Sequence, residues 1–248
     1  KDQFMNVFLA SEPKSLDPSR STDAYSNSVQ THIIDGLTRI EQENGKDKIV
    51  PGIAESWDVE NDGKTYVFHL RDAKWADGEP VTADQFVYGL KRTLDPNTGS
   101  QYAWIIKDVV KGGAEFNDGE GDADSVGITA VDEKTLKIEL ASPVAYFLDL
   151  TYFRVLLPQR KDIVEKYGDG FGSEAEHMMS NGAFILKEWI HDNKFVFEKN
   201  PTYWDAENVK LEKMTFNIVK DENARMNMIL NGSIDSGAVG KPEWMKKF

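Results

Sequence analysis

Alternating hydrophobic and polar positions predict three β-hairpins of one construction, which span residues 57–70, 128–140 and 184–198. In the first hairpin, Asn-Asp-Gly at 61–63 supplies the turn, and Tyr66, Phe68 and Leu70 alternate with polar residues along the returning strand. The hairpins are unequally spaced, so we attribute their likeness to hairpin geometry and not to a repeat array. A shorter run, residues 3–9, is typical of a single strand.

Helical spacing of apolar residues marks two amphipathic helices. Residues 24–37 carry the first, with apolar positions at Val29, Ile33, Ile34 and Leu37. The second begins at Thr82, which forms a capping box with Gln85, and its apolar stripe continues to Leu94. Asp95-Pro96 then ends this helix.

Two further segments are indicated by glycine and proline. Pro158 precedes a predicted helix at 159–167, which Gly168 ends. Residues 112–127 are rich in Gly and Asp, and we expect a surface loop there. Helices alternating with hairpins predict a mixed α/β fold.

Composition limits the classes of partner. The 248 residues are enough for one or two domains with a sizeable core. The net charge of −13 excludes a nucleic-acid-binding role, which needs clustered Lys and Arg, and disfavours docking on anionic lipid. The most apolar stretch, residues 145–158, is interrupted by Asp149 and Arg154 and is too short to span a bilayer.

Residues that carry chemistry are sparse, and we expect neither a metal nor a cofactor. Cysteine is absent, which excludes disulfides, thiolate zinc sites and a cysteine nucleophile. The four histidines lack metal-ligand spacing. Asp122, Asp124, Gly127 and Glu133 partly match a calcium loop, but Val126 and Ala130 stand where ligands are needed, which favours a plain acidic loop. Phosphate-loop and nucleophile-elbow motifs are also absent, so the sequence favours a binding protein over an enzyme.

Aromatic residues are assigned first to the core. Trp57, Phe68 and Trp75 are expected to pack around the first hairpin. Tyr102-Ala103-Trp104 follows a turn at 95–99, where aromatic side chains are well placed to line a cleft.

Six segments together resemble family 5 of the extracellular solute-binding proteins, the oligopeptide- and dipeptide-binding components of ABC importers. The segments are residues 12–18, 54–57, 62–71, 74–86, 181–189 and 198–205. They include Lys-Trp-Ala-Asp-Gly-Glu-Pro-Val-Thr-Ala-Asp-Gln-Phe at 74–86 and Asn-Pro-Thr-Tyr-Trp-Asp at 200–205. These motifs consist mostly of turn, cap and core residues, so they indicate family membership more than choice of ligand.

The resemblance implies an α/β fold of the type II periplasmic-binding architecture. Residues 1–34 and 142–248 would form an incomplete mixed-sheet lobe, and residues 35–141 a smaller α+β lobe inserted into it. Members of this family are considerably longer. We therefore expect the chain to be truncated, an N-terminal half without the region that closes over the ligand.

The resemblance also places ligand contacts. They are expected at Thr22, Asp23 and Ala24, on the loop that carries Tyr102, and at Ala238, Val239 and Gly240. Some members have a Glu-Gly pair where this chain has Thr22-Asp23. For Asp23, contact with a ligand amine or backbone stands beside a plain role as the acid at a helix start.

The function implied is capture of oligopeptides, without catalysis, for delivery to ABC permease subunits. The implied location is extracytoplasmic, as a cell-surface lipoprotein or free in the periplasm, with a monomeric protein touching the membrane only through a lipid anchor absent from this sequence. The alternatives are a non-peptide ligand such as a nickel chelate, haem or a sugar, a hydrolase of peptides or glycosides, and a chaperone or adhesion role.

Overall fold

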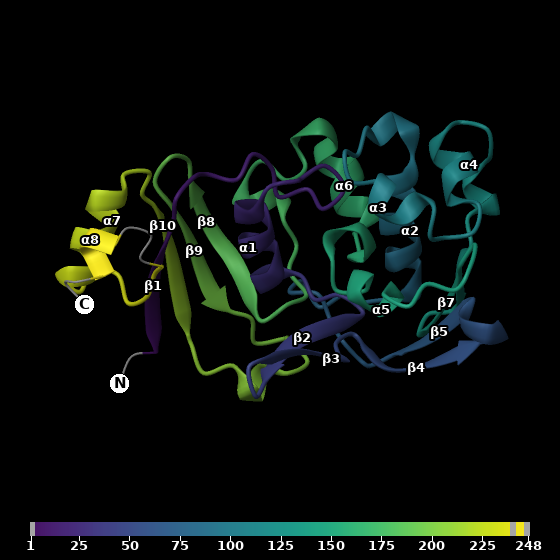
Figure 1. The fold of residues 1–248 in the computed structure, drawn as a ribbon, viewed down its shortest axis with the longest axis horizontal. Helices are drawn as coiled ribbons and strands as arrows, with labels where there is room; N and C mark the ends of the chain where they lie inside the picture. The colour runs from purple at the N-terminus through teal and green to yellow at the C-terminus, as the bar shows by residue number, and fades with distance from the viewer. Residues whose placement is uncertain (1–2, 239–241, 246–248) are drawn as a thin grey trace.

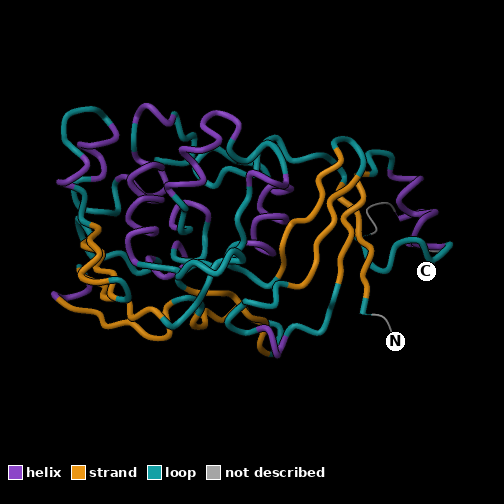
Figure 2. Tube along the Cα trace, turned by 180° about the vertical axis from the view of Figure 1, so that it is seen from behind, coloured by secondary structure: helices purple, strands orange, loops and turns teal. Residues whose placement is uncertain are grey.

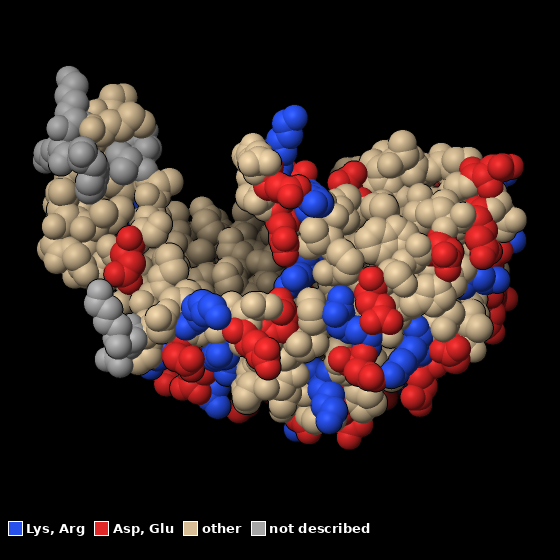
Figure 3. All heavy atoms as spheres, turned by 90° about the horizontal axis from the view of Figure 1, so that it is seen from below, with Lys and Arg blue, Asp and Glu red and all other residues tan. Residues whose placement is uncertain are grey.

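The computed structural model describes residues 3–238 and 242–245. It has one four-stranded sheet toward the end of the molecule that carries both termini and a second toward the opposite end (Figures 1 and 2). A two-stranded hairpin lies along one edge between them. The space-filling view in Figure 3 shows a hollow in one face, with a floor made mostly of residues other than Lys, Arg, Asp and Glu.

The first sheet has the strand order β1-β10-β9-β8. These strands are β1 (Phe4–Leu9), β8 (Phe184–Ile190), β9 (Lys194–Lys199) and β10 (Lys213–Ile218). β1 pairs in parallel with β10, from Phe4 opposite Lys213 to Leu9 opposite Ile218, and the other pairings are antiparallel. The structure confirms the strand predicted near the start and the third predicted hairpin, which is β8 and β9.

The second sheet is entirely antiparallel, with the order β4-β5-β7-β6. Its strands are β4 (Ala54–Glu60), β5 (Thr65–Leu70), β6 (Ile128–Asp132) and β7 (Thr135–Glu139). They are the first two predicted hairpins, joined side by side where β5 pairs with β7. Asn61, Asp62 and Gly63 all have positive φ, as the tight turn requires.

A hairpin of β2 (Thr38–Glu43) and β3 (Lys46–Pro51) is absent from the predicted elements. Its turn is Asn44-Gly45, with φ of 53° and 75°. This pair of residues suits a two-residue hairpin turn because both accept positive φ.

Eight α-helices occur in the described part of the chain: α1 (Ala24–Ile33), α2 (Ala83–Leu94), α3 (Trp104–Lys107), α4 (Gly113–Asn117), α5 (Phe147–Leu150), α6 (Lys161–Tyr167), α7 (Glu222–Leu230) and α8 (Pro242–Met245). α2 matches its prediction, and Gln85 Oε1 accepts a hydrogen bond from the Thr82 N–H at 3.0 Å. α1 ends earlier than predicted, since the backbone turns extended at Ile34. The loop predicted at 112–127 is wrong in part, because α4 and a short turn at Ala123–Ser125 lie within it.

Two hydrophobic cores hold the elements together. One is formed by β4, β5, β6 and β7 against the apolar stripe of α2, with Phe68, Trp75 and Phe86 fully buried. The other packs α1 on the first sheet, with Ile33, Phe195 and Phe197 at its centre. The lobe boundaries given above stay a prediction. No helix in the described ranges combines the length and apolar character that a membrane span requires.

Candidate functional site

The loop before α1 is shaped by its own polar side chains. Asp17 Oδ1 accepts the Ser19 N–H at 2.9 Å, and the Asp17 carbonyl accepts the Ser21 N–H at 2.9 Å. These bonds turn the chain tightly after Leu16, as expected where Asp sits at a turn. The turn places residues 21–24 at the start of α1.

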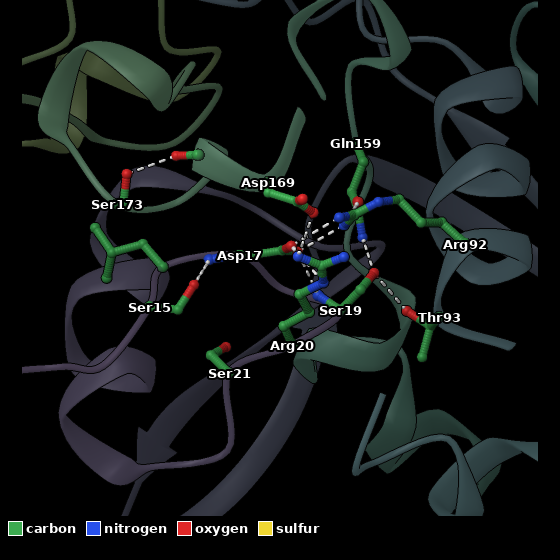
Figure 4. A network of polar contacts seen from close by, with 12 residues as sticks. Ser15, Asp17, Ser19, Arg20, Ser21, Arg92, Thr93, Gln159, Asp169 and Ser173 are labelled. Carbon is green, nitrogen blue, oxygen red and sulfur yellow. Dashed lines mark hydrogen bonds and ion pairs between the residues drawn. The ribbon is translucent and has the colours of Figure 1, made fainter. Parts of the chain in front are cut away.

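This loop is clamped to α2 by a buried ion pair, drawn in Figure 4. Arg92 donates to both carboxylate oxygens of Asp17, at 2.6 and 2.7 Å, and the Asp17 side chain is only 1% exposed. Gln159 joins the pair: its Oε1 accepts from Arg92, and its Nε2 donates to Ser19 Oγ. Burial opposes the charge of Arg92, but the hydrogen bonds and charge of Asp17 outweigh it and raise the pKa of the guanidinium. The loop before α1, α2 and the chain near Gln159 are therefore held in one arrangement.

Two of the residues predicted to contact ligand are joined directly. Tyr102 donates its hydroxyl to the Thr22 carbonyl oxygen at 2.7 Å, across 80 positions of sequence. Asp23, the third, caps α1: its carboxylate accepts the Ser26 N–H at 2.7 Å and the Ser26 hydroxyl at 2.5 Å. The plain helix-start role of Asp23 is thus present, and the Asp23 carboxylate is committed to it. Ala24 begins α1 and is exposed.

Arg154 supports the same segment from behind and was not among the predicted site residues. It donates to Ser21 Oγ at 2.9 Å and to the Asp23 carbonyl oxygen at 3.0 Å, while only 3% exposed. Its guanidinium carbon lies 5.6 Å from the centre of the Tyr102 ring and 5.5 Å from that of Phe153. Burial lowers the pKa of Arg154. The sequence does contain a signal for this role, an arginine in the mostly apolar stretch 145–158. A charge buried there is costly unless it is paired or hydrogen-bonded.

The contact predicted at residues 238–240 lies elsewhere in the structure. Ala238 is exposed and follows Asp235, whose N–H donates to the Asn6 carbonyl at 2.8 Å and whose Oδ2 accepts from the Asn6 N–H at 2.6 Å. Residues 235–238 thus leave the outer edge of β1. Val239 and Gly240 lie outside the described residues. No contact joins Ala238 to Thr22 or Tyr102 among the described residues.

A pocket of about 420 Å³ lies beside α1. Its lining comes from α1, the chain just after α1, β2 and the loop after α5: Asn27, Thr31, Ile34, Asp35, Gly36, Thr38, Arg39, Ile40, Tyr152 and Phe153. Phe153 also stacks on Tyr102, with ring centres 6.1 Å apart. Phe153 thus links the pocket to Tyr102, which is bonded to Thr22.

Two of the lining residues, Asp35 and Arg39, belong to a polar cluster. Asp35 Oδ2 accepts from Tyr203 Oη at 2.9 Å and from Trp204 Nε1 at 3.0 Å. Arg39 donates to Tyr203 Oη at 2.9 Å and to Asp205 at 3.3 Å. Burial, together with the neighbouring Asp35 charge, raises the pKa of the Tyr203 phenol, so it stays a neutral donor. The Asn-Pro-Thr-Tyr-Trp-Asp motif thus builds this cluster.

The arrangement offers binding groups and no reactive constellation. Across the part of the chain that the structure describes, no group of three or more His, Asp or Glu side chains is placed to hold a metal ion. His191 lies between Glu12 and Glu174, at 2.8 and 3.2 Å, on the exposed turn between β8 and β9.

Comparison with known proteins supplies the family context. Residues 48–247 match the family described as bacterial extracellular solute-binding proteins, family 5 Middle. The chain is 37% identical to the oligopeptide-binding protein OppA of Bacillus subtilis, over 93% of this chain and 42% of the relative. It is 37% identical to the dipeptide-binding protein DppE of the same organism, over 96% of this chain and 43% of the relative.

Solved structures agree. The substrate-binding domain of an oligopeptide ABC transporter from Bacillus anthracis superimposes with a TM-score of 0.93 and 35% identity, covering 99% of this chain and 47% of that one. OppA of Haemophilus influenzae in complex with the peptide RPPGFSPFR gives a TM-score of 0.93 and 32% identity, covering 100% of this chain and 48% of that one. The chain thus spans less than half the length of these relatives and has their type II periplasmic-binding fold.

Proposed function

We propose that this chain, which belongs to family 5 of the bacterial extracellular solute-binding proteins, takes part in capturing oligopeptides for an ABC importer. The family binds solutes and is not a family of enzymes. The named relatives bind oligopeptides, dipeptides or murein peptides, which supports peptide as the ligand class here.

The observation that carries the proposal is which backbone groups of residues 22–24 are hydrogen-bonded and which are not. The carbonyls of Thr22 and Asp23 are occupied by Tyr102, Arg154 and the first turn of α1. The N–H groups of Thr22, Asp23 and Ala24 have no hydrogen bond to any described residue. A short strip of backbone donors is thus held rigidly, and it is complementary to the carbonyl groups of an extended peptide.

Rigid support is what makes such a strip useful. Side chains from two other regions, Tyr102 and Arg154, hold the segment in place, and Asp17 shapes the turn that precedes it. A preorganised backbone loses less conformational freedom when a ligand binds, so more of the hydrogen-bond energy appears as affinity. Recognition through backbone reads the length and extension of a peptide more than its side chains.

The rest of the proposal concerns the whole protein. Residues 1–34 with 142–248 form one lobe and residues 35–141 the inserted lobe, with the further region of a longer chain closing over the ligand by a hinge motion. Ala238, Val239 and Gly240 would contact ligand in that closed form. The protein acts as an extracytoplasmic monomer, lipid-anchored or free in the periplasm, and hands its ligand to permease subunits.

Calorimetry on the full-length protein tests the ligand class. Tri-, tetra- and pentapeptides should bind with dissociation constants of about 1 μM or below, or about −8 kcal/mol. One relative, YgiS of Escherichia coli, is named as a probable deoxycholate-binding protein. A bile acid is therefore titrated as the non-peptide ligand for comparison. Binding of the bile acid without binding of any peptide would overturn the peptide assignment.

A further inference from the structure

We propose that the pocket beside α1 is a subsite for a cationic group of the ligand, an ammonium or guanidinium that pairs with Asp35. This inference rests on the proposed peptide-binding function and names a ligand preference that the backbone contacts do not provide. The geometry around Asp35 carries it.

Asp35 is buried yet incompletely bonded. The residue is 7% exposed and lines the pocket. Oδ2 accepts two hydrogen bonds, from Tyr203 and Trp204, whereas Oδ1 accepts none from any described side chain. Oδ1 is also not among the fully enclosed polar atoms that lack a partner, so solvent reaches it. Burial raises the pKa of Asp35, and a cationic donor at Oδ1 would favour the ionised carboxylate.

The charges around the pocket favour a cation as that donor. Arg39 lines the pocket, and Arg39 and Arg71 both lie over the Trp204 ring, but four carboxylates act on these two arginines: Asp35, Glu41, Asp205 and Glu55. Tyr152 also lines the pocket, and burial, followed by the charges of Asp149 and Asp47, raises the pKa of its phenol. Among these groups, the carboxylates outnumber the guanidinium groups.

The walls suit a long side chain that ends in a cation. Tyr152, Phe153, Ile34 and Ile40 offer apolar and aromatic surface, on which a Lys or Arg stem packs and an aromatic face attracts the charge. Asn27 and Thr31 are neutral polar residues on the α1 side. Phe153 connects the pocket to Tyr102, so a peptide lying on residues 22–24 has the pocket beside it.

The test compares peptides that differ in one charge. Full-length protein is titrated with Ala-Lys-Ala, Ala-Arg-Ala and Ala-norleucine-Ala by calorimetry. The cationic peptides should bind at least about tenfold more tightly, a difference of about 1.4 kcal/mol.

Variants locate the effect. Asp35→Asn keeps an acceptor for Tyr203 and Trp204 and should abolish the preference for the cationic peptides. Thr31→Arg, an exposed position, places a positive charge in the same pocket without touching the buried cluster and should do the same. Glu165→Gln in α6 removes one exposed carboxylate outside the pocket and should leave the preference intact. Equal affinity of the three peptides for the unaltered protein would overturn the subsite alone, as would a preference that survives both variants. Failure of every peptide to bind would overturn the proposed function with it.

Discussion

The Tyr102 hydroxyl bridges two parts of the chain that are far apart in sequence, because it donates to the Thr22 carbonyl. The Tyr102→Phe variant should lower peptide affinity by about fivefold to tenfold, since the strip at 22–24 loses one support, and should cost about 1 kcal/mol of unfolding free energy. Calorimetry with a tripeptide and urea unfolding measure the two effects.

Tyr88→Phe is the matched control for that experiment. The Tyr88 hydroxyl makes no hydrogen bond to a described residue, and Tyr88 lines a separate pocket together with other residues of α2. The control should change peptide affinity by less than twofold. Equal losses in both variants would show that the Tyr102 hydroxyl does not support the ligand strip.

The Asp17–Arg92 pair gives a second prediction for single residues. Arg92→Met removes the guanidinium from a carboxylate that is 1% exposed, and a buried charge left without its partner costs about 3–5 kcal/mol. Lys161→Met, which breaks the exposed pair with Glu165, should cost at most about 0.5 kcal/mol. Urea unfolding of both variants tests the contrast, and a loss for Arg92→Met as small as for Lys161→Met would contradict the role of the pair.

At the scale of single elements, sequence reasoning succeeded where the signal is local. The turn at 61–63 and the capping box of Thr82 each depend on a few neighbouring residues, and both appear as expected. The hairpin at Asn44-Gly45 is locally marked too, but half of the residues in its strands are charged, and the strands show no clear alternation of hydrophobic and polar positions.

The candidate site was predictable only through family resemblance. Thr22 and Tyr102 are adjacent in space because α2 and the loop before α1 pack together, and no local pattern encodes a contact across 80 positions. Arg154 and Asp35 were missed for the same reason: their partners come from other elements.

The turn between β8 and β9 should respond to pH through His191. Burial, the largest single effect, opposes its charge, but the hydrogen bonds that its ring donates to Glu12 and Glu174, together with the charges of these carboxylates, outweigh burial and raise the pKa of the imidazole. A folded-state pKa above the unfolded value of about 6.5 gives stability that is complete below that pH and is lost as the pH rises through the folded-state pKa.

Urea unfolding of the parent protein and of His191→Gln, between pH 5.5 and 8.5, isolates this contribution. Their difference in unfolding free energy should shrink as the pH rises. The difference curve is needed because His32 acts in the opposite sense, since burial lowers its pKa. A difference independent of pH would contradict the role of His191.

At the scale of the whole molecule, the 248 residues would form one side of the proposed binding site, which the further region closes. Because the chain spans less than half of its relatives, a peptide bound to it alone remains largely in water. The 248-residue chain should therefore bind a tripeptide at least about a hundredfold more weakly than the full-length protein, a difference of about 2.7 kcal/mol. Calorimetry on both chains tests this, and equal affinities would show that closure contributes nothing.

The parallel pairing of β1 with β10 has a consequence for protein synthesis. Phe4 leaves the ribosome more than 200 residues before its partner Lys213 does, which at 5–20 residues per second is a wait of roughly 10 to 40 s. During that time the strands from β4 to β7 are complete and free to fold, while β1 remains an unpaired edge that can aggregate. Translation arrested after β7 and before β10 would therefore release a chain in which the sheet of β4 to β7 can form while β1 has no partner strand.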